Sequence, residues 1–306
     1  MTNTQKRIIS AIVLTFVVAI SIYLGKLACF FLILLVGPLV ADEIYTNFFK
    51  LPRGGPSYWF TLNMVVLPSL FVLIGDYVID HEVLSGITLL HQASLLAVAI
   101  NVLCIFFLFL YPMERSLEQK IPAFLMWPIG IVIFLLLSPI YLILFCDESV
   151  VLLIMLLLIT YSMDTGAWFF GRKYGKHKLW EKVSPKKTVE GLIGGMLTSG
   201  VVVSLVWAIL DYFDSGFAAT VRDQGGVVAM HGEFVYRVTL FVMFMLLSLI
   251  SQIGDLFQSK LKRLVNLKDS SQLIPGHGGV YDRVDSLIFV APFYYLFLRY
   301  LLKITC

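Results

Sequence analysis

The sequence has few charged residues, because only 14% of its 306 residues are Asp, Glu, Lys or Arg, whereas a typical soluble domain has about a quarter. It contains four cysteines, Cys29, Cys104, Cys146 and Cys306, which are scattered and form no C-x-x-C pair. An H-E-x-x-H motif is also missing. These absences argue against a disulfide framework, a structural zinc site and a zinc-dependent hydrolase.

Apolar residues make up 59% of the sequence, and the mean hydropathy is +0.88. A membrane-spanning helix needs about 20 apolar residues in succession. Nine runs approach or exceed that length, at residues 8–24, 27–41, 59–79, 88–111, 121–145, 149–170, 190–210, 234–257 and 286–303. The sequence therefore predicts an all-α, polytopic integral membrane protein with about nine transmembrane helices.

The basic residues are distributed unevenly between the two sides of this topology. With nine spans, most of the 23 Lys and Arg residues fall in the N-terminal segment and in the loops after even-numbered spans. Such loops face the cytoplasm. The N-terminus is therefore predicted to be cytoplasmic, and Lys6 and Arg7 are interpreted as part of this topology signal.

No repeat, linker or low-complexity segment divides the chain, so one membrane domain is expected. Within it, residues 1–145 have short, ordinary loops and are interpreted as a helical scaffold that can also support dimerisation. Residues 146–306 differ, because their cytoplasmic loops are rich in charged residues and glycine. The chemistry of the protein is therefore predicted to lie in residues 146–306.

Four carboxylates, Asp164, Asp255, Asp282 and Asp285, fall at the cytoplasmic ends of predicted spans. Carboxylates at membrane depth are costly, and they usually face a partner or a water-filled cavity. Asp282 and Asp285 are three residues apart, which places both on one face of a helix. Oxygen ligands and the absence of zinc motifs favour Mg²⁺. The alternative is that the four aspartates are unrelated helix caps or salt bridges.

Residues suited to phosphate binding surround these carboxylates. Glycines can bring backbone N–H groups close to a phosphate, and arginine can bind two phosphate oxygens. The candidates are Lys176, Lys178, Lys186, Lys187, Thr188, Lys262, Arg263, Lys268, Gly276, Gly278, Gly279 and Arg283. Together with the carboxylates they predict a site for a polyphosphate and a hard cation.

The segments "SKLKR" at 259–263 and "KDSSQLIPGHGGVYDRVDS" at 268–286 resemble the signature of the phosphatidate cytidylyltransferase, or CDP-diacylglycerol synthase, family. "DTGAWFFGR" at 164–172 and "SPKKTVEG" at 184–191 are similar to other blocks of that family, in the same order. Trp168 is a departure, since the family often has tyrosine there. The resemblance is specific between residues 159 and 286.

The resemblance implies an integral membrane enzyme that condenses CTP with phosphatidic acid to give CDP-diacylglycerol and pyrophosphate. It implies Mg²⁺ as cofactor, with a second, monovalent cation (K⁺) in some members, and a homodimer. The metal ligands carried over are Asp255 and Asp282, with Asp285 and Asp164 as further candidates. The expected location is the plasma membrane, with the active site facing the cytoplasm and no nucleic acid as partner.

Combining both lines of reasoning, the catalytic group is predicted to be Asp255, Asp282, Asp285, Lys262, Arg263, His277 and Arg283. The substrate-binding group adds Ser184, Ser259 and Asp269 to the lysines, Thr188 and the glycines above. His277 is favoured as a residue that orients substrate or an aspartate over a general acid. Lys268 and Asp269 form an ion pair or contact the substrate, with neither favoured.

Three other functions compete with this reading. A CTP-dependent transferase acting on another lipid phosphate or a polyprenol would use the same site. A cation-coupled transporter would use the aspartates, but transporter sites lie near the bilayer midplane and often in paired repeats. A purely structural scaffold would leave the charged cluster without a role.

Overall fold

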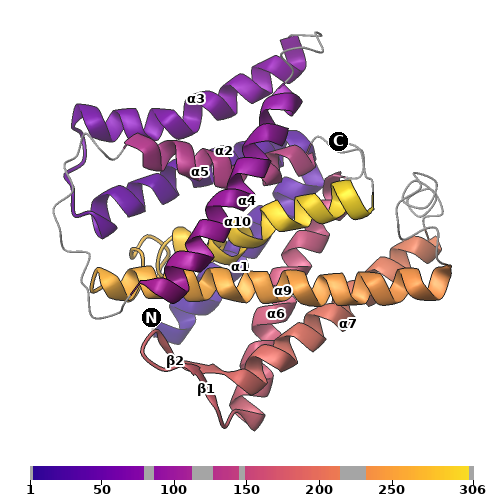
Figure 1. Ribbon diagram of the computed structural model, residues 1–306. Helices are drawn as coiled ribbons and strands as arrows, with labels where there is room; N and C mark the ends of the chain where they lie inside the picture. Colours follow the sequence, from indigo (N-terminus) through magenta and orange to yellow (C-terminus); the bar gives the residue numbers. More distant parts are fainter. Residues whose placement is uncertain (1–2, 79–85, 112–126, 145–148, 214–231, 303–306) are drawn as a thin grey trace. The chain divides into compact units, whose positions relative to one another are not determined.

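The computed structural model describes residues 3–78, 86–111, 127–144, 149–213 and 232–302 (Figure 1). Its main elements are helices, namely α1 (Asn3–Leu24), α2 (Lys26–Glu43), α3 (Pro56–Val78), α4 (Gly86–Leu110), α5 (Trp127–Leu144), α6 (Ser149–Tyr174), α7 (Val189–Phe213), α9 (Glu233–Leu264) and α10 (Tyr281–Leu296). Two π-helical segments, η1 (Ile44–Phe48) and η4 (Phe297–Leu301), extend α2 and α10. The predicted all-α architecture is confirmed.

The helices match the apolar runs closely, because each run satisfies its backbone hydrogen bonds internally in a bilayer only as a helix. Eight helices in the described part of the chain are long and apolar enough to cross a membrane. A further apolar helix, Pro128–Leu144, is shorter, and residues 121–126 of its predicted span lie outside the described residues. The number of nine spans and the cytoplasmic N-terminus remain predictions.

Two helices run further into the polar sequence than the apolar pattern suggests. The helix α9 continues to Leu264, so that Lys262 and Arg263 lie in its last turn. The helix α10 begins at Tyr281, whereas the predicted span began at 286. Asp282 and Asp285 therefore lie in the helix itself, not before it, and their three-residue spacing places them on one face.

The chain forms two compact units. The first contains residues 1–145 and 260–285, and the second contains residues 146–259 and 286–306. The boundary near residue 145 coincides with the predicted division of the chain, but the segment 260–285, which carries much of the signature, belongs to the first unit. The assignment of scaffold and catalytic roles to the two halves stays a prediction.

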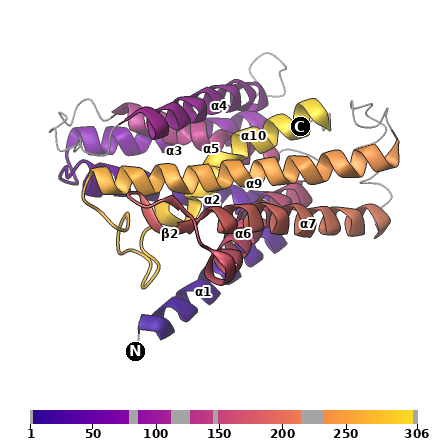
Figure 2. The same cartoon turned by 60° about the horizontal axis from the view of Figure 1, so that its bottom comes forward.

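In the first unit, α5 packs against α2, α3 and α4, and Figure 2 shows α3, α4 and α5 side by side. Phe30 of α2 packs on Tyr141 of α5 with ring centroids 4.7 Å apart. Close helix contact depends on Gly130, because a Cβ atom there would lie 2.2 Å from the Thr61 carbonyl oxygen. Cys29 and Cys104 are free thiols, whereas Cys146 and Cys306 lie outside the described residues.

In the second unit, α6 and α7 pack against each other and are joined by a two-stranded antiparallel hairpin, β1 (Lys178–Trp180) and β2 (Ser184–Thr188) (Figure 1). Gly194 and Gly195 allow the close packing, since Cβ atoms there would lie 2.3 Å from Phe170 Cγ and 2.7 Å from Met163 Sδ. Gly191 and Gly195 are spaced as G-x-x-x-G, a pattern that allows this kind of close helix contact, and a Cβ atom at Gly191 would lie 2.8 Å from the Ala167 carbonyl oxygen.

Candidate functional site

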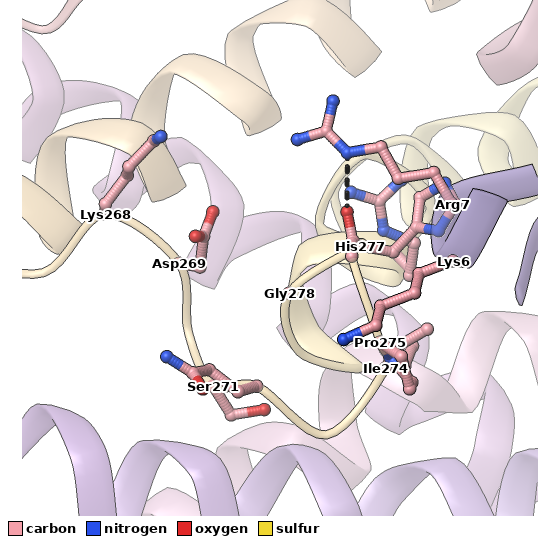
Figure 3. A pocket seen from close by; sticks show the side chains of 12 residues that line it. Lys6, Arg7, Lys268, Asp269, Ser271, Ile274, Pro275, His277 and Gly278 are labelled. Carbon is pink, nitrogen blue, oxygen red and sulfur yellow. Dashed lines mark hydrogen bonds between the residues drawn. The ribbon is translucent and has the colours of Figure 1, made fainter. Parts of the chain in front are cut away.

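The segment from Lys268 to Arg283 lines a pocket of about 720 Å³ in the first unit (Figure 3). Predicted site residues in its wall are Lys268, Asp269, Gly276, His277, Gly278 and Arg283. Lys6 and Arg7 of α1 complete the lining. None of the four Lys and Arg residues forms an ion pair within the described part of the chain. In particular, Lys268 forms no ion pair with Asp269 there. The pocket therefore carries four positive charges against one carboxylate.

Asp282 holds the polar segment in place from the start of α10. Its Oδ2 accepts hydrogen bonds from the Ser270 backbone N–H at 2.8 Å, the Ser270 hydroxyl at 3.0 Å and the Gly279 N–H at 2.9 Å. Its Oδ1 binds the Lys262 ammonium at 2.7 Å. Four donors thus stabilise the charged form of this carboxylate, and Asp282 fixes both the end of α9 and the loop.

A second carboxylate, Glu43 at the end of α2, is 2% exposed and was missed by the sequence analysis. One oxygen accepts from the Ser271 hydroxyl and the Val280 N–H, both at 2.7 Å. The other accepts from the Ser270 hydroxyl at 2.8 Å and the Tyr281 N–H at 2.9 Å. Glu43 therefore caps the N-terminus of α10, where backbone N–H groups lack helical partners.

The glycines of the "PGHGG" turn make room for these two carboxylates. Gly278 has φ +83°, and a Cβ atom there would lie 2.5 Å from Asp282 Oδ2. At Gly279 a Cβ atom would lie 2.0 Å from Ser270 Oγ and 2.5 Å from Glu43 Oε2. A side chain at either position would displace a buried acceptor. The approach of these glycines to a phosphate remains a prediction.

His277 is linked to α1 through Ser10, whose Oγ lies 2.6 Å from His277 Nδ1. The other neighbours of Ser10 Oγ are carbonyl oxygens of Lys6, Arg7 and Pro275, at 2.9, 3.1 and 3.0 Å. Because carbonyls only accept, the Ser10 proton is best directed to one of them, and we assign the Nδ1–H tautomer, in which His277 donates to Ser10.

Partial burial, together with the positive Arg283 and Arg7, lowers the pKa of His277 below its usual value. The imidazole is therefore neutral at pH 7, and its Nε2 carries no proton in the assigned tautomer. Such a ring can accept a hydrogen bond but has no Nε2 proton to give to a leaving group. This geometry favours the predicted orienting role over general acid catalysis.

Asp255, in the second unit, has a different environment. It pairs with Lys187 of β2, and it also lies 3.5 Å from Gln252 Nε2 and 3.4 Å from Ser259 Oγ. Its side chain is 29% exposed. Asp255 and Asp282 belong to different units, so their joint binding of a cation stays a prediction.

The β1–β2 hairpin presents several predicted phosphate ligands. Lys176, Lys178 and Lys186 are exposed, and Ser184 pairs with Trp180 across the hairpin. Glu190 fastens the base of the hairpin, since it accepts from the Lys176 and His177 backbone N–H groups at 3.0 and 3.2 Å. Lys178 Nζ donates to the Pro185 carbonyl at 2.6 Å. Lys176 and Lys186 are exposed and accessible to an anionic ligand.

Other candidates of the sequence analysis have structural contacts. Thr188 is 7% exposed, and its hydroxyl accepts from the Gly191 N–H at 3.1 Å as an N-cap of α7. Arg263 donates to the Leu267 carbonyl at 3.1 Å. Lys260, in the "SKLKR" segment, is 1% exposed and binds the Leu108 and Tyr111 carbonyls at the end of α4. Their side chains hold helix ends together.

The described residues contain no group of three or more His, Cys, Asp or Glu side chains placed to hold a metal ion. Asp164 is exposed on α6, and Asp285 is partly buried on α10. Whether either contacts a metal stays a prediction. The Asp255 side chain nevertheless suits a hard cation, because its carboxylate is partly exposed and Mg²⁺ prefers oxygen ligands.

Comparison with known proteins adds independent evidence. A phosphatidate cytidylyltransferase of Bacillus subtilis is 40% identical over 140 residues, which are 46% of this chain and 44% of that protein. The enzyme of the same name from Staphylococcus saprophyticus is 41% identical over 135 residues, 44% of each chain. The match thus spans less than half the length of these relatives. The model of the cytidylyltransferase family matches residues 5–301, and the chain belongs to that family.

Proposed function

We propose that this protein is a phosphatidate cytidylyltransferase, which transfers the cytidylyl group of CTP to phosphatidic acid in the plasma membrane. The observation that carries the proposal is the pocket of about 720 Å³ with four cationic side chains and one carboxylate. Its excess of positive charge suits a nucleoside triphosphate. The names of the relatives supply the lipid acceptor.

In the proposed reaction an oxygen of the lipid phosphate attacks the α-phosphorus of CTP. A new phosphorus–oxygen bond forms, the bond between the α-phosphorus and the bridging oxygen breaks, and pyrophosphate leaves. A phosphate monoester has a second pKa of about 6 and is mostly dianionic at neutral pH, so the attack needs no strong base. The pocket cations Lys268 and Arg283 stabilise the charge that develops on pyrophosphate.

Magnesium is the proposed cofactor, with Asp282 of the first unit and Asp255 of the second as its candidate ligands, because Mg²⁺ prefers carboxylate oxygens. When bound, Mg²⁺ supplies positive charge that reduces repulsion between the two phosphate-bearing substrates. Asp282 also keeps the loop of Lys268 and His277 in place through Ser270 and Gly279. The monovalent cation, the homodimer and the cytoplasmic orientation of the site stay predictions.

The test measures pyrophosphate and CDP-lipid formed from CTP by the purified protein in detergent. We expect both products only when phosphatidic acid and Mg²⁺ are present, and a large loss for Lys268→Ala. Lys26→Ala, which removes a charge at the other end of the α1–α2 pair, is the matched control. A wild-type protein that forms neither product with phosphatidic acid would overturn the proposal, and product with another lipid phosphate would reassign the acceptor.

A further inference from the structure

We propose that the N-terminal turn of α1 is a wall of the nucleotide site, and that Lys6 and Arg7 bind the triphosphate of CTP. The proposal rests on the function proposed above and extends it to a helix that carries no residue of the signature. Lys6 and Arg7 are the only charged residues of α1, which is otherwise suited to lipid. The predicted membrane topology accounts for the positive charge of these two residues, but it does not account for the contacts that they make.

The first argument is that α1 is fitted closely to the signature loop. Arg7 Nε donates to the Gly276 carbonyl at 2.9 Å (Figure 3), and Ser10 contacts the Pro275 carbonyl and His277 Nδ1. A Cβ atom at Gly276 would lie 2.8 Å from Arg7 Cγ, and the φ of +76° also requires glycine. Chain segments more than 260 residues apart are thus joined by three polar contacts.

The second argument is the charge that remains available after these contacts. Arg7 uses Nε for the Gly276 carbonyl, and its terminal nitrogens have no protein partner among the described residues. The Lys6 ammonium also has none there. Figure 3 shows both side chains across the cavity from Lys268 and Asp269. Cations held together without counter-charges raise one another's electrostatic energy, which a bound polyanion relieves.

The third argument is geometric capacity. A pocket of about 720 Å³ lies within the usual size of small-ligand sites, about 300–1,000 Å³. Lys268 and Arg283 belong to the signature segment at 268–286, whereas Lys6 and Arg7 belong to α1. A triphosphate has three phosphate groups to distribute over these four cations. Arginine suits such a site, because its planar group can bind two phosphate oxygens at once.

The experiment compares wild type, Lys6→Ala, Arg7→Ala and Arg7→Lys for the KM of CTP, the KM of phosphatidic acid and the affinity for inorganic tripolyphosphate. Loss of one charge-assisted contact is expected to weaken CTP and tripolyphosphate binding about ten- to hundredfold. The KM of phosphatidic acid should stay within about twofold, and Arg7→Lys should recover part of the loss because the charge is kept. Lys26→Ala is the charge-matched control.

Lys6→Ala separates binding from loop structure, since the Lys6 ammonium holds no part of the loop. If Lys6→Ala and Arg7→Ala both keep wild-type values for CTP and tripolyphosphate, the inference is wrong. Equal losses for CTP and phosphatidic acid would also overturn it, because they indicate a general disturbance of the fold. A wild-type protein that binds tripolyphosphate through Arg7 but makes no CDP-lipid would instead refute the proposed function alone.

Discussion

Asp282 in the first unit and Asp255 in the second are both paired with a lysine, yet the two ion pairs differ in their surroundings. The Asp282 side chain is 5% exposed and receives three further hydrogen bonds from the loop that it organises. The Asp255 side chain is 29% exposed, and its distances to Gln252 Nε2 and Ser259 Oγ are 3.5 and 3.4 Å. The two carboxylates, both predicted to be metal ligands, thus differ in how much of the surrounding structure they hold in place.

The difference indicates that Asp282 stabilises the fold in addition to any role in binding a cation. Asp255, in contrast, can change partners at little cost to stability. An enclosed carboxylate with several donors cannot be neutralised without leaving those donors unsatisfied. An exposed one can exchange its lysine for water or a metal ion. The predictions below use the free energy of unfolding to separate these two situations.

The largest effect is expected for Asp282→Asn. The substitution leaves the Lys262 ammonium without its carboxylate, and loss of one partner of a buried pair costs about 3–5 kcal/mol. Thermal unfolding in detergent should shift accordingly, and activity should be lost. The double variant Lys262→Met with Asp282→Asn should recover part of the stability, because no lone charge remains. A single variant with wild-type stability would contradict the structural role.

A smaller loss of stability is expected for Glu43→Gln, about 1–3 kcal/mol. The glutamine amide places an NH₂ group against N–H or O–H donors of Ser271, Val280, Ser270 and Tyr281, so at least one of them loses its acceptor. The adjacent Asp42→Asn is the matched control, since Asp42 pairs with the exposed Arg53. If both variants unfold at the same temperature, Glu43 does not hold the loop.

Asp255→Asn should change stability by about 1 kcal/mol or less, because its pair with Lys187 is partly exposed. Its activity should nevertheless fall about 10²- to 10³-fold if Asp255 stabilises the transition state through a cation. Titration of activity with Mg²⁺ is the measurement, and the variant should need more metal. A variant with full activity at the wild-type Mg²⁺ requirement would remove Asp255 from the metal site.

The smallest effect is a pH dependence at His277. Its pKa is lowered in the folded protein, so below its unfolded value of about 6.5 the unfolded chain binds a proton that the native chain does not. Its contribution to stability is therefore complete above about pH 6.5 and decreases as the pH falls below that value. His277→Gln should unfold with a weaker dependence on pH in that range. An unchanged dependence would show that His277 is not responsible.

The apolar runs predict most of each helix, but they do not predict the polar C-terminal end of α9 or the polar N-terminal end of α10. The segment 258–264 continues α9, and its Lys260 and Lys262 bind the Leu108 carbonyl and Asp282, partners that the apolar pattern does not reveal. The β1–β2 hairpin was not predicted either, since its strands, Lys178–Trp180 and Ser184–Thr188, are short and lack an alternating pattern. Local polar sequence is compatible with several conformations.

For the site, the sequence identified Lys268, His277, Arg283, Gly276 and Gly278, which line one pocket in the structure. It missed Glu43, Lys6 and Arg7. A glutamate at the end of an apolar run was a signal for Glu43, because a carboxylate at membrane depth usually has a partner. Its partner loop lies more than 220 residues away, and nothing in the sequence connects them.

The sequence by itself determined the membrane-spanning helices and the chemistry of the signature loop, because hydropathy and residue type act locally. Only the tertiary structure decided which residues surround that loop. Glu43 and Arg7 reach it because α1 and α2 belong to the same compact unit as residues 260–285. The tertiary structure also explains why glycine is needed at 278 and 279, because a side chain there would collide with Asp282 or Glu43. Contacts of this kind depend on the path of the whole chain, not on any single stretch of it.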